Sequence, residues 1–297
     1  MSHGQNGAHV PVLRDEVVEW LMPRPGGVYV DGTLGLGGHA GAILERTAPD
    51  GRLIGFEWDE DAAAMAADRL ARFGGRLTLV QASYADLVPE LDRLGIKGVD
   101  GLVVDLGVSS LQLDRIERGF SFRGDGALDM RMDRSRSVTA ATLVAELSEE
   151  QLADLFYHYG EERQARRIAR FLVAARQEEP VATTGRLAAI VAAAVPRKYH
   201  PSKVHVATKV FQALRIAVNG ELDNLTRLLA TAPAVLKPGA RICIITFQSL
   251  EDRIVKQSFL HNPAYQVVSR RPIGPSAGEI EHNPRARSAK LRVAARA

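Results

Sequence analysis

The sequence has little of what builds disulfide-rich, zinc-bound or membrane proteins. Its one cysteine in 297 residues, Cys243, excludes an internal disulfide and any zinc site made of several cysteines. The longest apolar run, residues 187–195, is far shorter than the ~20 residues that cross a bilayer, and no charged-then-apolar leader opens the chain. We therefore expect a protein of a reducing compartment, the cytoplasm, with neither a signal peptide nor a membrane contact.

Histidine spacing and charge narrow the possible ligands. His200 and His205 have no partner at metal-ligand spacing, so we assign no metal. The net charge is only +3, yet residues 270–297 carry seven Lys and Arg against two Glu, which makes this segment +5. Concentrated positive charge suits a phosphate backbone, because neutralised phosphates release counterions, whereas a solvated charged surface is the alternative.

Five short apolar runs alternate with helical patterns and predict the strands of a parallel sheet. They cover residues 28–31, 52–57, 77–81, 102–105 and 241–247. The last two lack polar alternation, which is typical of strands covered by helices on both faces. A helix over residues 59–73 is the clearest connection between them. The sequence therefore predicts an α/β fold with a doubly wound, Rossmann-like sheet.

More than a hundred residues separate the fourth predicted strand from the fifth, which predicts an inserted domain. Ser148 and Gln151 have capping-box spacing ahead of one helical pattern, and Thr184 is a candidate cap for another. We predict an all-helical insert over residues 137–200 and a discontinuous main domain over residues 1–136 and 201–297.

Glycines and acids follow the first two predicted strands. Asp31 runs into a loop with Gly35, Gly37 and Gly38, where the missing side chains let the backbone approach a ligand closely. Glu57 follows about twenty residues later, where a carboxylate can accept the hydroxyls of an adenosine ribose. NAD and S-adenosylmethionine both satisfy this pattern. An acid beside the loop attracts the cationic S-adenosylmethionine and repels a pyrophosphate, so Asp31 favours the former.

A second polar group follows the fourth predicted strand. Asp105 precedes Ser109 and Ser110, which puts a carboxylate and two hydroxyls at the carboxyl edge of the sheet, where doubly wound folds bind ligands. These three residues are our candidates for catalysis. Tyr84, after the third strand, is a candidate to lie against the adenine, and a core position for its ring is an equal alternative.

Together these motifs resemble the bacterial ribosomal RNA small subunit methyltransferase H family. The matching blocks span nearly the whole chain and cover residues 9–13, 31–39, 105–114, 118–132, 159–162, 209–222, 249–253 and 288–292. The resemblance implies methyl transfer from S-adenosylmethionine to N4 of a cytidine in the decoding region of 16S ribosomal RNA, within the small ribosomal subunit.

The resemblance also implies roles for individual residues. By position it implies cofactor contacts from Gly37, Gly38, His39, Glu57, Tyr84, Asp105 and Gln112. Glu57 stands where the family usually has Asp, and Gln248 where it usually has His; a Gln cannot carry a proton. We expect the helical insert, residues 118–136 and residues 270–297 to hold the RNA. A nicotinamide-dependent dehydrogenase and a non-catalytic RNA-binding assembly factor are the alternative functions.

Overall fold

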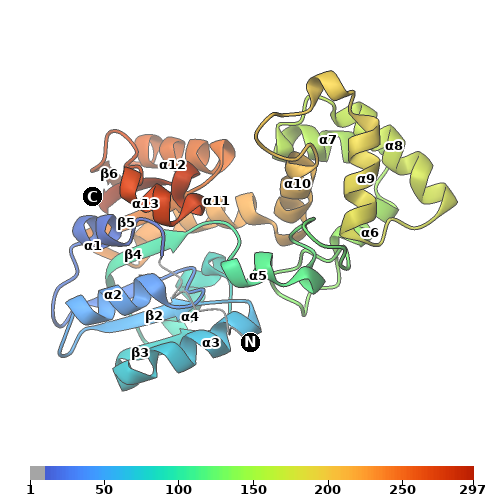
Figure 1. The fold of residues 1–297 in the computed structure, drawn as a ribbon. Helices are drawn as coiled ribbons and strands as arrows, with labels where there is room; N and C mark the ends of the chain where they lie inside the picture. The colour runs from blue at the N-terminus through green and yellow to red at the C-terminus, as the bar shows by residue number, and fades with distance from the viewer. Residues whose placement is uncertain (1–10) are drawn as a thin grey trace. The chain divides into compact units, whose positions relative to one another are not determined.

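The computed structural model describes residues 11–297, so the first two residues of the 9–13 block lie outside the described part. The chain divides into two compact units (Figure 1). Unit 1 comprises Met1–Gly107 and Leu222–Ala297, and unit 2 comprises Val108–Glu221. Unit 2 is therefore wider than the predicted 137–200 insert at both of its ends.

Within residues 11–297, unit 1 is built around a mixed sheet of seven strands in the order β3-β2-β1-β4-β5-β7-β6. These are β1 (Val28–Asp31), β2 (Arg52–Phe56), β3 (Leu77–Val80), β4 (Val99–Asp105), β5 (Leu236–Thr246), β6 (Tyr265–Val267) and β7 (Lys290–Arg296). The first five pair in parallel, whereas β7 runs antiparallel to β5 and β6. The predicted doubly wound parallel sheet is confirmed, and the sequence missed its two antiparallel strands.

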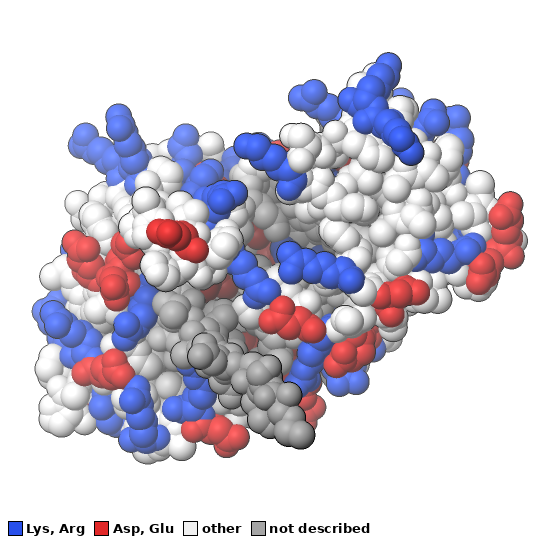
Figure 2. Space-filling view, in the orientation of Figure 1, with Lys and Arg blue, Asp and Glu red and all other residues white. Residues whose placement is uncertain are grey.

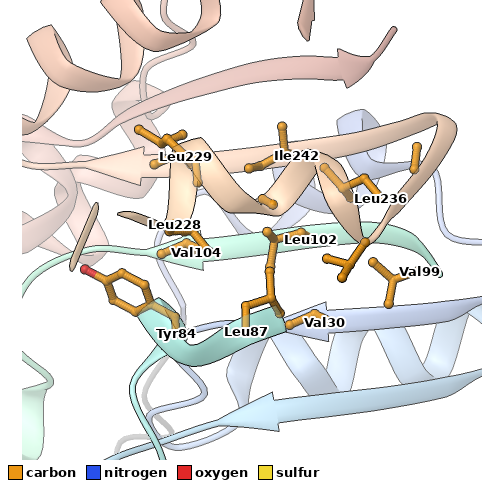
Figure 3. Packing of buried hydrophobic residues seen from close by; sticks show 14 of the residues in the cluster. Val30, Tyr84, Leu87, Val99, Leu102, Val104, Leu228, Leu229, Leu236 and Ile242 are labelled. Atoms are coloured by element: carbon orange, nitrogen blue, oxygen red, sulfur yellow. The ribbon is translucent and has the colours of Figure 1, made fainter. Parts of the chain in front are cut away.

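Helices cover both faces of this sheet because successive strand residues point to opposite sides. One face carries Tyr29, Val103 and Ile245. The other carries Ile244 together with Val30 and Val104, which Figure 3 labels. The first is covered by α1 (Arg14–Leu21), α2 (Gly38–Arg46) and α3 (Glu60–Leu70), and the second by α4 (Leu87–Arg93), α11 (Glu221–Thr231) and α12 (Ser249–His261). All six strand residues are buried, which explains the uninterrupted apolar runs.

The C-terminal basic segment enters the sheet. After α13 (Ala277–His282) the chain forms β7, where Arg292 is buried and donates to Asp252 at 2.6 Å. Lys290 lies 3.3 Å from the same carboxylate, and Arg296 donates to the Pro233 carbonyl at 3.0 Å. These three cations therefore have contacts within unit 1, and RNA binding by residues 270–297 stays a prediction.

Unit 2 is helical. Its helices are α5 (Ser110–Asp114), α6 (Ala140–Glu146), α7 (Glu149–Gly160), α8 (Ala165–Glu178), α9 (Thr184–Ala194) and α10 (Thr208–Asn219). The capping box at the start of α7 is confirmed, because the Ser148 hydroxyl accepts from the Gln151 N–H and the Gln151 side chain accepts from the Ser148 N–H. The predicted cap of α9 is wrong by one residue: Thr183 caps the helix, while the Thr184 hydroxyl donates to the Gly124 carbonyl.

Long-range backbone contacts explain why unit 2 extends beyond residues 137–200. The Leu128 N–H donates to the Ala182 carbonyl at 2.9 Å. The Asn219 amide of α10 accepts from the Met132 N–H and donates to the Met130 carbonyl, both at 2.8 Å. These bonds tie residues 118–132 and α10 to the helices between them.

The basic residues of this segment are partly structural. Arg118 is buried and donates to the carbonyls of Arg131 and Met132. The Arg131 guanidinium forms a two-point pair with Asp129, with contacts of 2.7 and 2.8 Å. Arg118 and Arg131 therefore have hydrogen-bond partners within unit 2, and RNA binding by residues 118–136 stays a prediction.

Candidate functional site

Two acids predicted from the sequence lie at the carboxyl ends of neighbouring strands. Asp31 ends β1 and Asp105 ends β4, and these strands pair in parallel. The chain leaves β1 toward β2 and β3 on one side and returns to β4 on the other. Such a reversal of strand order opens a crevice at the carboxyl edge, where open α/β sheets bind their ligands.

The loop after β1 turns tightly over this edge. The Gly32 N–H donates to the Val103 carbonyl at 2.8 Å, and the Asp105 N–H donates to the Thr33 hydroxyl at 2.6 Å. A β-carbon on Gly32 would lie only 2.9 Å from the Val104 side chain. Glycine is therefore required for the chain to pass this close to β4, and Thr33 locks the end of one strand to the loop of the other.

Gly37, Gly38 and His39 form the start of α2. Gly37 is the N-cap residue with a φ of 78°, in the left-handed region that favours glycine. A β-carbon there would meet Leu70 of α3 at 2.6 Å, and one on Gly38 would meet Pro11 at 2.9 Å. The N-terminal amides of α2 are thus presented next to the carboxyl edge, without side chains from its N-cap and its first residue.

Glu57 follows β2 and is held by backbone donors on both sides. Its Oε2 accepts from the Gly35 N–H at 2.8 Å, and its Oε1 accepts from the Asp59 N–H at 2.9 Å. Burial raises the pKa of Glu57 to about 7, against these two hydrogen bonds, which lower it. Each carboxylate oxygen has two lone pairs, so the fixed side chain can accept further hydrogen bonds from a ligand.

Asp31, His39 and Asp105 form a polar cluster in which Asp31 and His39 are buried and Asp105 is partly buried. His39 Nε2 lies 3.7 Å from Asp105 Oδ2, beyond hydrogen-bond distance. Asp31 Oδ1 accepts from the Thr33 N–H at 3.1 Å. Among residues 11–297, no hydrogen-bond partner is present for Asp31 Oδ2, for Asp105 Oδ1 or for either ring nitrogen of His39. Buried polar atoms are normally satisfied, so four such atoms in one cluster indicate a place where a polar ligand binds.

Burial and neighbouring charge perturb this cluster. Burial raises the pKa of Asp31 to about 6, although His39 and the Thr33 amide oppose the shift. For His39, burial favours the neutral ring, but the carboxylates of Asp105 and Asp31 outweigh it and raise the pKa. Perturbed groups gathered in a crevice are typical of functional sites.

Tyr84 lies in a short turn after β3, and its side chain is buried among core residues (Figure 3). Its ring belongs to the same cluster as Leu87 and Val104. Its Cβ lies 3.1 Å from where a β-carbon on Gly32 would be, which places Tyr84 beside the loop. Tyr84 is thus a core residue, as one of the two predicted alternatives has it. Its position beside the loop leaves an edge of the residue within reach of a ligand in the crevice.

The other predicted residues belong to unit 2. Ser109 is the N-cap of α5, and its hydroxyl accepts from the Gln112 N–H at 3.2 Å. Gln112 is buried, and its side-chain oxygen accepts a hydrogen bond from the Ser109 N–H at 3.0 Å. Ser110 is the first residue of α5. The structure therefore gives Ser109 and Gln112 a capping function that the sequence reasoning missed, although the Ser-x-x-Gln spacing signals it.

A third strand end contributes a polar turn that sequence reasoning left without an assignment. After β5, Oε2 of the buried Glu251 accepts from the N–H groups of Phe247 and Gln248 at 2.9 and 3.1 Å. Gln248 Oε1 is buried and has no hydrogen-bond partner within the described chain. Glu251 is thus a positioning group for this turn, and its signal in the sequence is its place three residues after the N-cap of α12.

The strand order 3-2-1-4-5-7-6 and the acid–glycine–acid crevice define unit 1 as a Rossmann-like methyltransferase domain. The chain belongs to the MraW methylase family, whose model matches residues 6–297. It is 57% identical over 286 residues to "Ribosomal RNA small subunit methyltransferase H" of Desulfotalea psychrophila, with 96% of this chain and 97% of the relative covered. It is 49% identical to the protein of that name in Symbiobacterium thermophilum, with 96% and 95% covered.

Membrane-spanning helices and metal-binding clusters are absent from residues 11–297. No helix in this part of the chain is both long and apolar enough to span a bilayer. The same residues contain no group of three or more His, Cys, Asp or Glu side chains placed to hold a metal ion. The polar cluster of unit 1 contains two acids and one histidine, and His39 Nε2 lies 3.7 Å from Asp105 Oδ2.

Proposed function

We propose that this protein transfers a methyl group from S-adenosylmethionine to N4 of a cytidine in the decoding region of small-subunit 16S ribosomal RNA. The observation that carries the proposal is the polar cluster of Asp31, His39 and Asp105, whose unsatisfied atoms lie beside the glycine loop. The printed names of relatives at 49–57% identity support the RNA substrate.

The residues present fit S-adenosylmethionine. Asp31 Oδ2, which has no hydrogen-bond partner among residues 11–297, offers an acceptor and a negative charge to a cationic ligand. The attraction between the two charges is stronger in a buried site than in water. Glu57, fixed by two backbone donors, offers its remaining lone pairs to the ribose hydroxyls. Gly37 and Gly38 let the chain turn into α2 against Leu70 and Pro11, and the N-terminal amides of α2 are proposed to face the rest of the molecule. A pyrophosphate would meet the Asp31 charge instead, which disfavours a nicotinamide cofactor.

The remaining proposed contacts complete a pocket for the adenosine and the amino acid. His39 and Asp105 provide hydrogen-bonding atoms at the floor of the crevice, and Tyr84 provides an apolar edge. Gln112 is proposed as a cofactor contact because it lies in the family motif of residues 105–114. When bound, the cofactor supplies a methyl group carried on a sulfonium centre.

Asp105 is the proposed acceptor for the cytidine amine. The exocyclic amine shares its lone pair with the ring, so an acceptor must hold its hydrogens and stabilise the positive charge that develops on nitrogen. Asp105 Oδ1 has no partner among residues 11–297, and its backbone is fixed by Thr33. The Ser109 and Ser110 hydroxyls are the alternative acceptors. Orientation of amine against methyl then provides the main rate acceleration.

The target base must leave its stack to reach this edge. Proteins read RNA bases mainly where the bases are unpaired and splayed out, and base-modifying enzymes take the target into a pocket. We assign recognition of the surrounding RNA to unit 2. The assembled small subunit is the proposed form of the substrate, which places the enzyme in the cytoplasm.

Nucleoside analysis of methylated small subunits tests the proposal. Purified protein is incubated with labelled S-adenosylmethionine and small subunits from a strain lacking the enzyme. The RNA is then digested to nucleosides, which are separated by chromatography and identified by mass spectrometry. We expect label only in N4-methylcytidine. Label in C5-methylcytidine, which has the same mass and a different retention time, would contradict the proposed atom, and no label would contradict the reaction. A parallel incubation with NAD and no labelled cofactor tests the dehydrogenase alternative.

A further inference from the structure

The connection between α9 and α10 exposes an aromatic ring that the fold does not use. Tyr199 is 53% exposed and Val204 is 56% exposed, within a turn that the core of unit 2 does not cover. Large apolar groups at such exposure in a solvated loop offer contact area to a partner. A flat phenol ring offers in particular a face on which a nucleobase can stack.

The same connection carries charge of one sign. Between Glu179 and Glu221 the sequence contains no Asp or Glu, but it contains six Lys and Arg. Arg197, Lys198 and Lys203 are exposed, and the Lys198 ammonium lies 4.9 Å from the centre of the Tyr199 ring. Figure 2 shows Lys and Arg gathered over the end of unit 2 where Figure 1 draws this connection. The ring is therefore surrounded by cations that no nearby carboxylate in the sequence neutralises.

Hydrogen bonds and a ring contact hold the connection in shape. The Tyr199 N–H donates to the Pro196 carbonyl at 2.8 Å, and the His200 ring is bonded to the Val195 carbonyl at 2.9 Å. At the other end, the His205 ring lies 4.7 Å from the Phe122 ring, centroid to centroid. A loop fixed at both ends presents its ring and its charges with less ordering cost on binding than a free arm.

We propose that the Arg197–Lys203 loop binds an unpaired stretch of the substrate RNA, with one base stacked on Tyr199 and phosphates paired with Arg197, Lys198 and Lys203. The proposal rests on the proposed function for its choice of RNA. The acidic side chains of a protein partner would also pair with the cations, but they would not stack on the face of the Tyr199 ring as a nucleobase does. Alternation of exposed aromatic and basic side chains is typical of surfaces that hold single-stranded nucleic acid.

Unit 2 offers a matched control for the ring. Tyr157 of α7 is 60% exposed, slightly more than Tyr199. Its helix neighbour three residues before is Asp154, and the C-cap of its helix is Glu161, so acidic residues lie near it in the sequence. A tyrosine next to carboxylates is a poor place for a phosphate backbone. Lys97, exposed in the loop before β4 of unit 1, is a matched control for charge.

The test measures binding of the full-length protein to a fluorescent single-stranded oligoribonucleotide and to the same strand in a duplex. We expect Tyr199→Ala to weaken single-strand binding by about tenfold or more, with little effect on the duplex, because stacking contributes ~1–3 kcal/mol per base. Tyr199→Trp should restore binding, since it keeps an aromatic face. Tyr157→Ala should bind as the unmodified protein does.

Charge is tested by the salt dependence of the same binding. The double variant Arg197→Ala with Lys198→Ala should lower the slope of log affinity against log salt by about 1.4, from ~0.7 per phosphate contact on a single strand. Lys97→Ala should leave the slope unchanged.

Each result decides for or against the loop. Equal affinities of Tyr199→Ala and the unmodified protein would overturn the stacking proposal, as would equal losses for Tyr199→Ala and Tyr157→Ala. An effect of the double variant without an effect of Tyr199→Ala would indicate a charge surface for any polyanion and would also overturn it. Calorimetry with S-adenosylmethionine is run on every variant. Absence of heat from the unmodified protein contradicts the proposed function, whereas normal heat with unaltered RNA binding in all variants contradicts only the loop.

Discussion

Two groups of acids in this protein, one partly buried and one buried, have opposite surroundings. Asp252 faces Arg292 and Lys290 across the sheet, and Asp129 faces Arg131 in unit 2. Burial raises the pKa of each acid, but these cations outweigh burial and leave the pKa of Asp252 and of Asp129 below the ordinary value.

Among residues 11–297, no Lys or Arg is paired with Asp31 or Glu57, and only His39, beside Asp31, opposes the effect of burial by its charge. Burial raises the pKa of Asp31 to about 6 and that of Glu57 to about 7. The structural carboxylates are thus paired with Lys or Arg side chains, whereas the carboxylates at the carboxyl edge of the sheet have no Lys or Arg partner within the described residues. An acid kept without a counter-charge costs stability, which is expected where a cationic or hydroxyl-rich ligand completes the site.

Loss of Asp105 should have the largest effect. We expect Asp105→Ala to lower kcat of methyl transfer by at least about 100-fold, because it removes the acceptor for the charge that develops on the amine. Single-turnover methylation of small subunits measures this. Asp100→Asn, at the other end of β4 and paired with Lys237, should retain the unmodified rate. A variant without Asp105 that binds cofactor and methylates normally would remove this residue from the mechanism.

The two groups of acids should respond oppositely to neutralisation. Asp252→Ala leaves the buried Arg292 without its partner and should destabilise by about 3 kcal/mol, a fall of roughly 6–12 °C in Tm. Asp31→Asn keeps an acceptor for the Thr33 N–H and removes a buried charge, so it should raise the Tm of the ligand-free protein at pH 8 by a few degrees.

The pH dependence of the second change follows from the pKa of Asp31. A carboxyl whose pKa in the folded state lies above the unfolded value destabilises as pH rises through the folded pKa. The advantage of Asp31→Asn should therefore be full above pH 6 and shrink as pH falls toward 5. Thermal scans of both variants at pH 8 and pH 5 measure it. A fall in Tm for Asp31→Asn at pH 8 would mean that the charge is satisfied.

Cofactor affinity should depend on the ionisation of Glu57. Ribose hydroxyls donate to the ionised carboxylate, so binding favours the charged form. As pH falls below about 7, the dissociation constant for S-adenosylmethionine should rise, by up to about tenfold per unit. Calorimetry between pH 5.5 and pH 8.5 gives the profile. Glu57→Gln should bind weakly and with a flatter profile, and an unchanged profile would contradict the role of Glu57.

The smallest effect should come from Gln248. A Gln cannot exchange a proton, so an acid or base at this position is not required, and Gln248→His should change kcat by less than about threefold. A pH–rate profile of the variant against the unmodified protein checks this. A large gain in rate with a new ionisation near the pKa of histidine would show that this position can take part in proton transfer.

Much of the fold could be predicted, because the strands of the parallel sheet are buried on both faces and appear as uninterrupted apolar runs. The missed strand β7 alternates basic and apolar residues. Lys290 and Arg292 of this strand pair with Asp252, which is 40 positions away from Arg292, and no local pattern reveals this contact. The borders of unit 2 were missed for a similar reason, since the Met132–Asn219 bond spans 87 positions.

The site was predictable where its chemistry is local. Asp31, the glycines and Glu57 follow strand ends, and the structure brings Asp31 and Asp105 to one edge. The hydrogen bond from Asp105 to Thr33 could not be predicted, because it joins two strands through a residue that appears in the sequence as part of the glycine loop. The Ser-x-x-Gln spacing predicts capping by Ser109 and Gln112. Their polar groups also follow a strand end, which favoured a prediction of ligand contacts instead.

Calorimetric titration of the unmodified protein and of Asp31→Asn, each with S-adenosylmethionine and with its demethylated product, tests the central claim most directly. The account predicts that the unmodified protein binds both ligands and that Asp31→Asn loses affinity for the cationic S-adenosylmethionine by about tenfold or more, from loss of a buried charge pair. No heat from the unmodified protein with either ligand would contradict it.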